Sequence, residues 1–88
     1  MELNEYQKIA MSTAIYPNDS KISYLSLALC GEAGEVADKV KKVLRDKDGC
    51  YSGEDKREIA LELGDCLWYI ANLASAICFP LNNIAEMN

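Results

Sequence analysis

Four carboxylates, arranged as two pairs, are the residues of this chain best suited to chemistry. Glu32 and Glu35 are three residues apart, and Glu62 and Asp65 repeat that spacing later in the sequence. Residues three apart on a helix are neighbours on one surface. If both pairs lie on helices that face each other, they form a cage of four negative charges.

Apolar residues around each pair indicate that the acids lie at the edge of a core. At about 100° per residue, the first apolar stripe is formed by Leu25, Leu29, Val36 and Val43. Glu32 falls inside this stripe and Glu35 at its edge, where an unpaired carboxylate is costly. The second pair borders a stripe formed by Ile59, Cys66, Ile70, Leu73 and Ile77. Most such pairs are merely a solvated helix face, but two matching pairs predict a site for a divalent cation.

Length and composition indicate one small domain, residues 1–88, that associates with copies of itself. Half of the 88 residues are hydrophobic, and a domain of this size buries only a modest fraction of its surface. In the third predicted helix, Leu61 and Trp68 project away from the apolar stripe. This second apolar side predicts a homo-oligomer, although Trp68 could instead pack within one chain.

Charge and residue types exclude several classes of function. The net charge is −5 and the pI about 4.6, which argues against binding polymeric nucleic acid. The absence of histidine removes histidine-assisted nucleophilic catalysis and imidazole ligation of metal. The four cysteines include no C-x-x-C pair, and three lie in helical patterns where we expect them buried: Cys30, Cys66 and Cys78. With no signal peptide and no apolar run of membrane-spanning length, we expect a cytoplasmic protein with free thiols.

Periodicity and capping signals predict an all-α fold, a bundle of about four helices. The predicted helices cover residues 4–16, 21–46, 54–77 and a short segment from Asn82 or Asn83 toward the end. Asn4 and Gln7 resemble a capping box for the first helix, and Ser52 with Asp55 resembles one for the third. A turn is predicted at residues 17–20.

The acidic motif and its flanking residues resemble the MazG-like nucleoside triphosphate pyrophosphohydrolases. The resemblance lies in Glu-x-x-Glu, 26 intervening residues and Glu-x-x-Asp, within the segments 30–39 (CGEAGEVADK) and 62–71 (ELGDCLWYIA). It implies an all-α homodimer or homotetramer with Mg²⁺ at the carboxylates, Mn²⁺ being an alternative ion. The implied reaction splits a nucleoside triphosphate into the monophosphate and pyrophosphate.

The resemblance and the positions of the residues together suggest roles for individual side chains. Glu32, Glu35, Glu62 and Asp65 occupy the family's metal and catalytic positions, and hard carboxylate oxygens suit Mg²⁺. Glu32, the most embedded in apolar surface, is the best candidate for assisting the attacking water, or it is a metal ligand only. Lys39 could reach a phosphate, or it is a solvated lysine.

Tyr69, one turn beyond Asp65, could stack on the base of a bound nucleotide, or it packs in the core. Relatives often continue past the position of Asn88 with basic residues that hold phosphates, and those are absent here. Two functions therefore stay open: a metal-dependent pyrophosphohydrolase, or a catalytically silent helical oligomer that acts as a binding or regulatory module.

Overall fold

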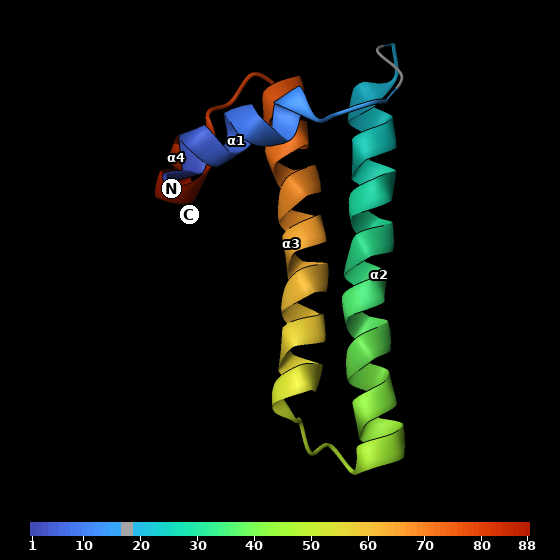
Figure 1. Ribbon diagram of the computed structural model, residues 1–88. Coiled ribbons are helices and arrows are strands. Elements are labelled where there is room, and N and C mark those ends of the chain that lie inside the picture. The colour runs from blue at the N-terminus through green and yellow to red at the C-terminus, as the bar shows by residue number, and fades with distance from the viewer. Residues whose placement is uncertain (17–18) are drawn as a thin grey trace.

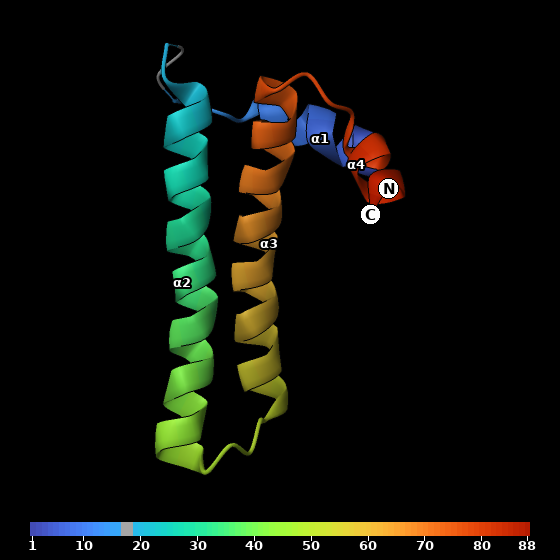
Figure 2. The same cartoon turned by 180° about the vertical axis from the view of Figure 1, so that it is seen from behind.

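Two long antiparallel helices form the body of the protein in the computed structural model, which describes residues 1–16 and 19–88. These are α2 (Lys21–Lys47) and α3 (Gly53–Ala76), joined by the short connection 48–52 (Figure 1). Two shorter helices, α1 (Leu3–Ser12) and α4 (Leu81–Met87), lie together beside the end of α3 that is far from this connection (Figures 1 and 2). The described residues contain no strand, so the predicted all-α class with four helices is confirmed.

The α2–α3 connection is specified by local chemistry. Asp48 ends α2 in the left-handed conformation (φ 52°), and Gly49 follows with φ 75°, a conformation that glycine adopts without steric cost. Ser52 and Asp55 form the predicted capping box: the Ser52 Oγ accepts from the Asp55 amide, and the Asp55 carboxylate accepts from the Ser52 amide. Lys47 also donates to Asp55 over 2.7 Å. This ammonium and the Ser52 amide lower the pKa of Asp55 to about 2. The ion pair between Lys47 and Asp55 therefore persists in the hairpin turn well into acid.

The core has two parts, both small. Leu25 and Val43 are buried in the seam between α2 and α3, as the first apolar stripe predicted. A second cluster joins α1, α3 and α4 and consists of Ala10, Ala71, Ala74 and Leu81, with Tyr6, Trp68 and Ile84 packed around it. Trp68 thus packs within the chain, which is the alternative considered for it, and it donates through Nε1 to Thr13 Oγ1.

Three expectations about local structure are wrong: the end of the first helix, its N-cap residue and the burial of the cysteines. The first helix ends at Ser12 rather than Tyr16, and Glu2, not Asn4, stands at its N-cap. Cys30 is exposed and Cys66 only half-buried, because a pair of helices lacks the outer layer needed to enclose them. Cys78 is exposed because it lies beyond the end of α3, in the connection to α4. The first two residues of the predicted turn at 17–20 lie outside the described residues.

Neither long helix meets the requirements of a membrane span. Across residues 1–16 and 19–88, no single helix is both long and apolar enough to cross a bilayer. By length and composition alone, α3 and α4 are apolar and long enough for a span only when taken together, and they are bent by 100° relative to each other.

Candidate functional site

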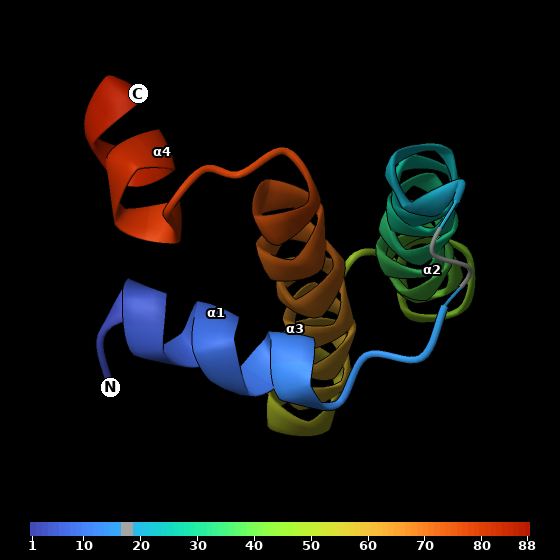
Figure 3. The same cartoon turned by 90° about the horizontal axis from the view of Figure 1, so that it is seen from above.

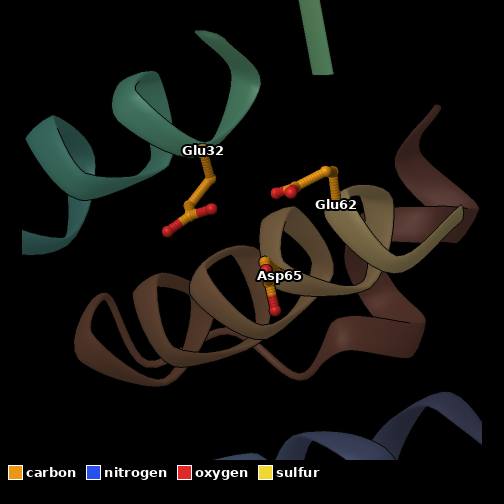
Figure 4. Close-up of side chains that lie close together, drawn as sticks. All are labelled: Glu32, Glu62 and Asp65. Atoms are coloured by element: carbon orange, nitrogen blue, oxygen red, sulfur yellow. The ribbon is translucent and has the colours of Figure 1, made fainter. Parts of the chain in front are cut away.

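Three of the four predicted carboxylates meet in the seam between α2 and α3. Glu32 comes from α2, and Glu62 and Asp65 come from successive turns of α3. One carboxylate oxygen from each lies within 4.8 Å of the others. Glu32 and Glu62 extend toward each other across the gap between the helices, and Asp65 stands beside them (Figure 4). The antiparallel hairpin brings together acids that are about thirty residues apart in sequence.

The electrostatics of the cluster are those of an uncompensated negative site. Partial burial raises the pKa of Glu32, and the negative charges of Asp65, Glu62 and Glu35 raise it further. The Cys66 thiol beside them has its pKa raised by burial and then by the same acids, Glu32 foremost. No salt bridge to the three carboxylates occurs among the described residues. A cation would therefore relieve repulsion that the protein itself leaves in place.

The donor set fits a hard divalent cation. Three carboxylates on two helices supply only oxygen ligands, and Mg²⁺ is bound in proteins by a few carboxylates while it keeps waters and substrate oxygens. Mn²⁺ accepts the same ligands. The half-buried thiol of Cys66, with its raised pKa, stays protonated near neutral pH and is a poor competing ligand.

A cleft opens directly beside the carboxylates. It has a volume of about 330 Å³ and is lined by Glu32, Asp65, Trp68 and Tyr69. The two aromatic rings meet edge to face, with centroids 4.9 Å apart and planes at 85°. Burial, followed by the nearby Tyr24 and Glu32, raises the pKa of Tyr69, so its phenol stays neutral. The cleft thus combines an acidic end with flat apolar walls.

Helix α1 holds the aromatic wall in place. Besides the Trp68 bond to Thr13, the fully buried Asn72 donates through Nδ2 to the Trp68 carbonyl at 3.0 Å and to the Ala10 carbonyl at 3.4 Å. Its Oδ1 has no hydrogen-bond partner among the described residues. Tyr6 of α1 has its pKa raised by burial and then by the negative charge of Asp65.

The other predicted site residues are distributed unevenly around the cleft. Tyr69, for which base stacking is a prediction, lines the cleft. Glu35 is exposed and lies outside the group of three, although its charge is felt by Glu32. Lys39 is half-buried farther along α2 and does not line the cleft. Trp68 was not predicted as a site residue; its position three residues after Asp65, on the same helix side, is the signal that could have revealed it.

The fold and site define a helical-hairpin protein with an acidic centre next to an aromatic cleft. Residues 20–86 match the family model of the MazG nucleotide pyrophosphohydrolase domain. This match covers most of the chain and includes all four predicted carboxylates. The chain therefore belongs to the MazG family, as its acidic motif indicated.

A curated relative matches the chain over its full length. The chain is 43% identical over 94 aligned residues to the protein named Gene 37 protein of Mycobacterium phage L5, and the match covers all of this chain and 82% of the relative. No solved structure matches the chain significantly.

Proposed function

We propose that the protein is a metal-dependent nucleoside triphosphate pyrophosphohydrolase, which converts an NTP or dNTP into the monophosphate and pyrophosphate. The observation that supports this most is the meeting of Glu32, Glu62 and Asp65 within 4.8 Å beside an aromatic cleft. Membership of the MazG family supplies the reaction class. The net charge of −5 favours a small nucleotide over a polymeric nucleic acid as substrate, and the free cysteines favour a cytoplasmic location.

The carboxylates would hold the metal, Mg²⁺ or Mn²⁺. The proximity of Glu32, Glu62 and Asp65 supports their assignment as ligands, and the spacing of Glu35 and its effect on Glu32 support its assignment as a fourth ligand. When bound, the ion neutralises triphosphate charge and lowers the pKa of a water. Phosphoryl transfer needs mainly such positioning and neutralisation, with no covalent nucleophile from the protein.

The chain's own residues would orient the substrate and accept a proton. Tyr69 and Trp68 offer flat surfaces for the base, and the walls of the cleft exclude part of the bulk water. Glu32 lines the cleft, and this position places it to assist the attacking water. Lys39 is half-buried on the same helix, and we assign it a phosphate contact.

A panel of NTPs and dNTPs with saturating Mg²⁺ tests the proposal, with pyrophosphate measured separately from orthophosphate. We expect nucleoside monophosphate and pyrophosphate in equal amounts. Glu62→Gln and Asp65→Asn should each reduce kcat/KM at least about a hundredfold, because a lost ligand removes several kcal/mol of charge stabilisation. Glu35→Gln should do the same, because we assign Glu35 as the fourth ligand. Glu54→Gln, which removes a charge at the exposed start of α3, is the matched control.

The outcomes separate the enzyme from the silent module. Wild-type turnover in both Glu62→Gln and Asp65→Asn would exclude the proposed site. Wild-type protein that binds Mg²⁺ but hydrolyses none of the substrates would identify a catalytically silent helical module instead.

A further inference from the structure

We propose that Thr13 and Asn72 are positioning residues that hold the indole of Trp68 as a fixed wall of the nucleotide site. Neither of them lines the cleft, so each acts through the indole. They determine how tightly a nucleotide binds rather than how fast the bound nucleotide is hydrolysed. The identity of the ligand, a nucleoside triphosphate, rests on the proposed function, whereas the rigidity of the indole does not depend on it.

A closed circuit of hydrogen bonds joins Trp68 to the C-terminal end of α1. The indole Nε1 donates to Thr13 Oγ1 at 3.1 Å, and Thr13 Oγ1 donates to the Ala10 carbonyl at 3.0 Å. Asn72 Nδ2 donates to the same Ala10 carbonyl at 3.4 Å and to the Trp68 carbonyl at 3.0 Å. The circuit therefore ties the tip of the indole, through α1, to the backbone of its own helix.

The direction of each hydrogen bond in the circuit is determined by its neighbours. An indole N–H can only donate, so the Thr13 hydroxyl accepts from it and sends its own hydrogen to the Ala10 carbonyl. The amide nitrogen of Asn72 contacts two carbonyl oxygens, and turning the amide over would set oxygen against oxygen. Because each bond polarises the next one, such a circuit is more rigid than two separate bonds.

Asn72 occupies a place where a polar group is costly. Its side chain is fully buried, and within residues 1–16 and 19–88 its Oδ1 has no hydrogen-bond partner, which lowers stability. Both carbonyls that it contacts have other donors. The Ala10 carbonyl accepts from the amide and hydroxyl of Thr13, and the Trp68 carbonyl accepts the regular bond of α3. Leucine would therefore serve folding at least as well, and what the amide adds is the orientation of Trp68.

The braced indole is a wall of the cleft that contains the carboxylates. Trp68 and Tyr69 line this cleft together with Glu32 and Asp65. The C-terminal end of α1 lies against α3 (Figure 3), so α1 supports the wall from outside the cleft. A side chain that is fixed before the ligand arrives loses little freedom on binding, and this raises affinity. A loosened indole should therefore weaken nucleotide binding, while the carboxylates of α2 and α3 keep their positions.

Four variants separate the brace from general stability. Thr13→Val removes the hydroxyl at nearly constant shape, and Thr13→Ser keeps it. Asn72→Leu removes the amide and its unpaired oxygen together. Ser12→Ala is the matched control, because Ser12 Oγ donates to the Ile9 carbonyl at 2.6 Å, which is the same kind of bond in the same turn but stays within α1.

Fluorescence tests the brace without any nucleotide, because Trp68 is the only tryptophan of the chain. We expect faster acrylamide quenching and a loss of anisotropy in Thr13→Val and Asn72→Leu, and wild-type values in Thr13→Ser and Ser12→Ala. Asn72→Leu should melt no lower than wild type; if it fails to fold, Thr13→Val carries the test alone. Wild-type quenching and anisotropy in the brace variants would show that the indole is not held by these residues and would overturn the proposal.

Binding and turnover test the consequence for the nucleotide. Calorimetry uses the α,β-methylene analogues of dATP and dCTP with Mg²⁺, and turnover uses the parent dNTPs. In Thr13→Val and Asn72→Leu we expect Kd and KM to rise roughly threefold to tenfold, as for one lost hydrogen bond, with kcat nearly unchanged. Thr13→Ser and Ser12→Ala should match wild type.

The outcomes distinguish the brace from the proposed function. A wild type that binds neither analogue would overturn the proposed function and, with it, the role of Trp68 as a nucleotide wall. A wild type that binds them, together with brace variants of unchanged Kd, would overturn the positioning role alone. A fall in kcat at constant KM, or an equal rise of Kd in Ser12→Ala, would also contradict it.

Discussion

Glu32 is a carboxylate whose surroundings disfavour its charge as long as no cation is bound. It lies in the apolar seam, close to Glu62 and Asp65, and both burial and these charges raise its pKa. The ionised carboxylate is thus less stable in the folded chain than in the unfolded chain. A cation at the cluster would reverse that balance, so metal and fold stability are coupled through this side chain.

Glu32→Gln should reveal the coupling, because we expect its effect on stability to have opposite signs in EDTA and in Mg²⁺. The pKa of Glu32 in the folded chain lies above its ordinary value of 4.5. Ionisation of Glu32 therefore lowers the free energy of unfolding once the pH rises above 4.5, whereas well below pH 4.5 the side chain is protonated in both states and has no effect. In EDTA we therefore expect Glu32→Gln to be more stable than wild type at pH 7, with the gap closing toward pH 4. Saturating Mg²⁺ should reverse the order, because a ligand at a hundred times its Kd contributes about 2.7 kcal/mol.

Thermal melts of the two proteins in EDTA and in Mg²⁺, from pH 4 to 7, provide the measurement. Glu54→Gln, which removes a charge at an exposed position of α3, should show neither the gap nor the reversal. If Mg²⁺ leaves the wild-type melting temperature unchanged and calorimetry detects no binding, the cluster is not a metal site.

Spacing alone was enough to predict the grouping of Glu32, Glu62 and Asp65, because i, i+3 positions and an apolar stripe identify a helix side. Spacing did not predict that Glu35 would lie outside this group. Three residues of helix turn a side chain by about 300°, and this moves Glu35 from the seam to its exposed edge. The role of Trp68 was missed for a related reason: its burial depends on α1, and helical periodicity does not determine where α1 packs.

At the scale of elements, α1 acts as a clamp: its polar side chains hydrogen-bond to the start of α4 and hold that helix in place. Gln7 Nε2 donates to the Phe79 carbonyl at 2.9 Å and to Ser75 Oγ at 3.1 Å, while its Oε1 accepts from the Leu81 amide at 2.8 Å. Asn4 Oδ1 accepts from the Asn82 amide at 3.0 Å. These two side chains satisfy amide groups at the start of α4, which has no side-chain cap of its own.

Gln7→Ala should loosen α4 without unfolding the hairpin. It removes three hydrogen bonds from a partly exposed place, and we expect the free energy of unfolding to fall by about 1–2 kcal/mol. Amide exchange should speed up most in α4. Gln7→Glu loses the two donated bonds but keeps the accepted one, so its effect should be smaller than that of Gln7→Ala. Lys8→Ala, at the exposed neighbouring position, should match wild type; equal exchange in all four proteins would contradict the clamp.

The clamp also explains why one capping prediction succeeded and the other did not. Ser52 and Asp55 bond to each other's backbone within four residues, so sequence alone determines the arrangement. Asn4 and Gln7 have the same spacing and chemistry, but the amides they serve are more than seventy residues away. A local pattern cannot distinguish a side chain that caps its own helix from one that caps a distant helix.

The molecule as a whole has little core for its length. Its longest extent is 43 Å against 24 Å for the shortest, and six hydrophobic side chains are buried among residues 1–16 and 19–88. The second apolar stripe on α3 was predicted to face the core, yet Ile70 and Ile77 are exposed. Both facts are expected if a second copy of the chain packs on the exposed apolar residues of α2 and α3.

The melting temperature should therefore depend on protein concentration. If folding and pairing are coupled, a tenfold rise in chain concentration stabilises the pair by about 1.4 kcal/mol, which for a pair of this total length corresponds to roughly 3–5 °C. A dilution series from 1 to 100 µM, followed by circular dichroism, should show this increase for wild type. The control Leu27→Lys/Leu61→Lys, which introduces two charges at other exposed leucines, should show the same increase. Leu63→Lys/Leu67→Lys should melt lower and at a temperature independent of concentration, because its transition involves one chain. A wild-type melting temperature that stays constant over the series would show that each chain folds and melts alone, and that the sparse core of α2 and α3 is sufficient by itself.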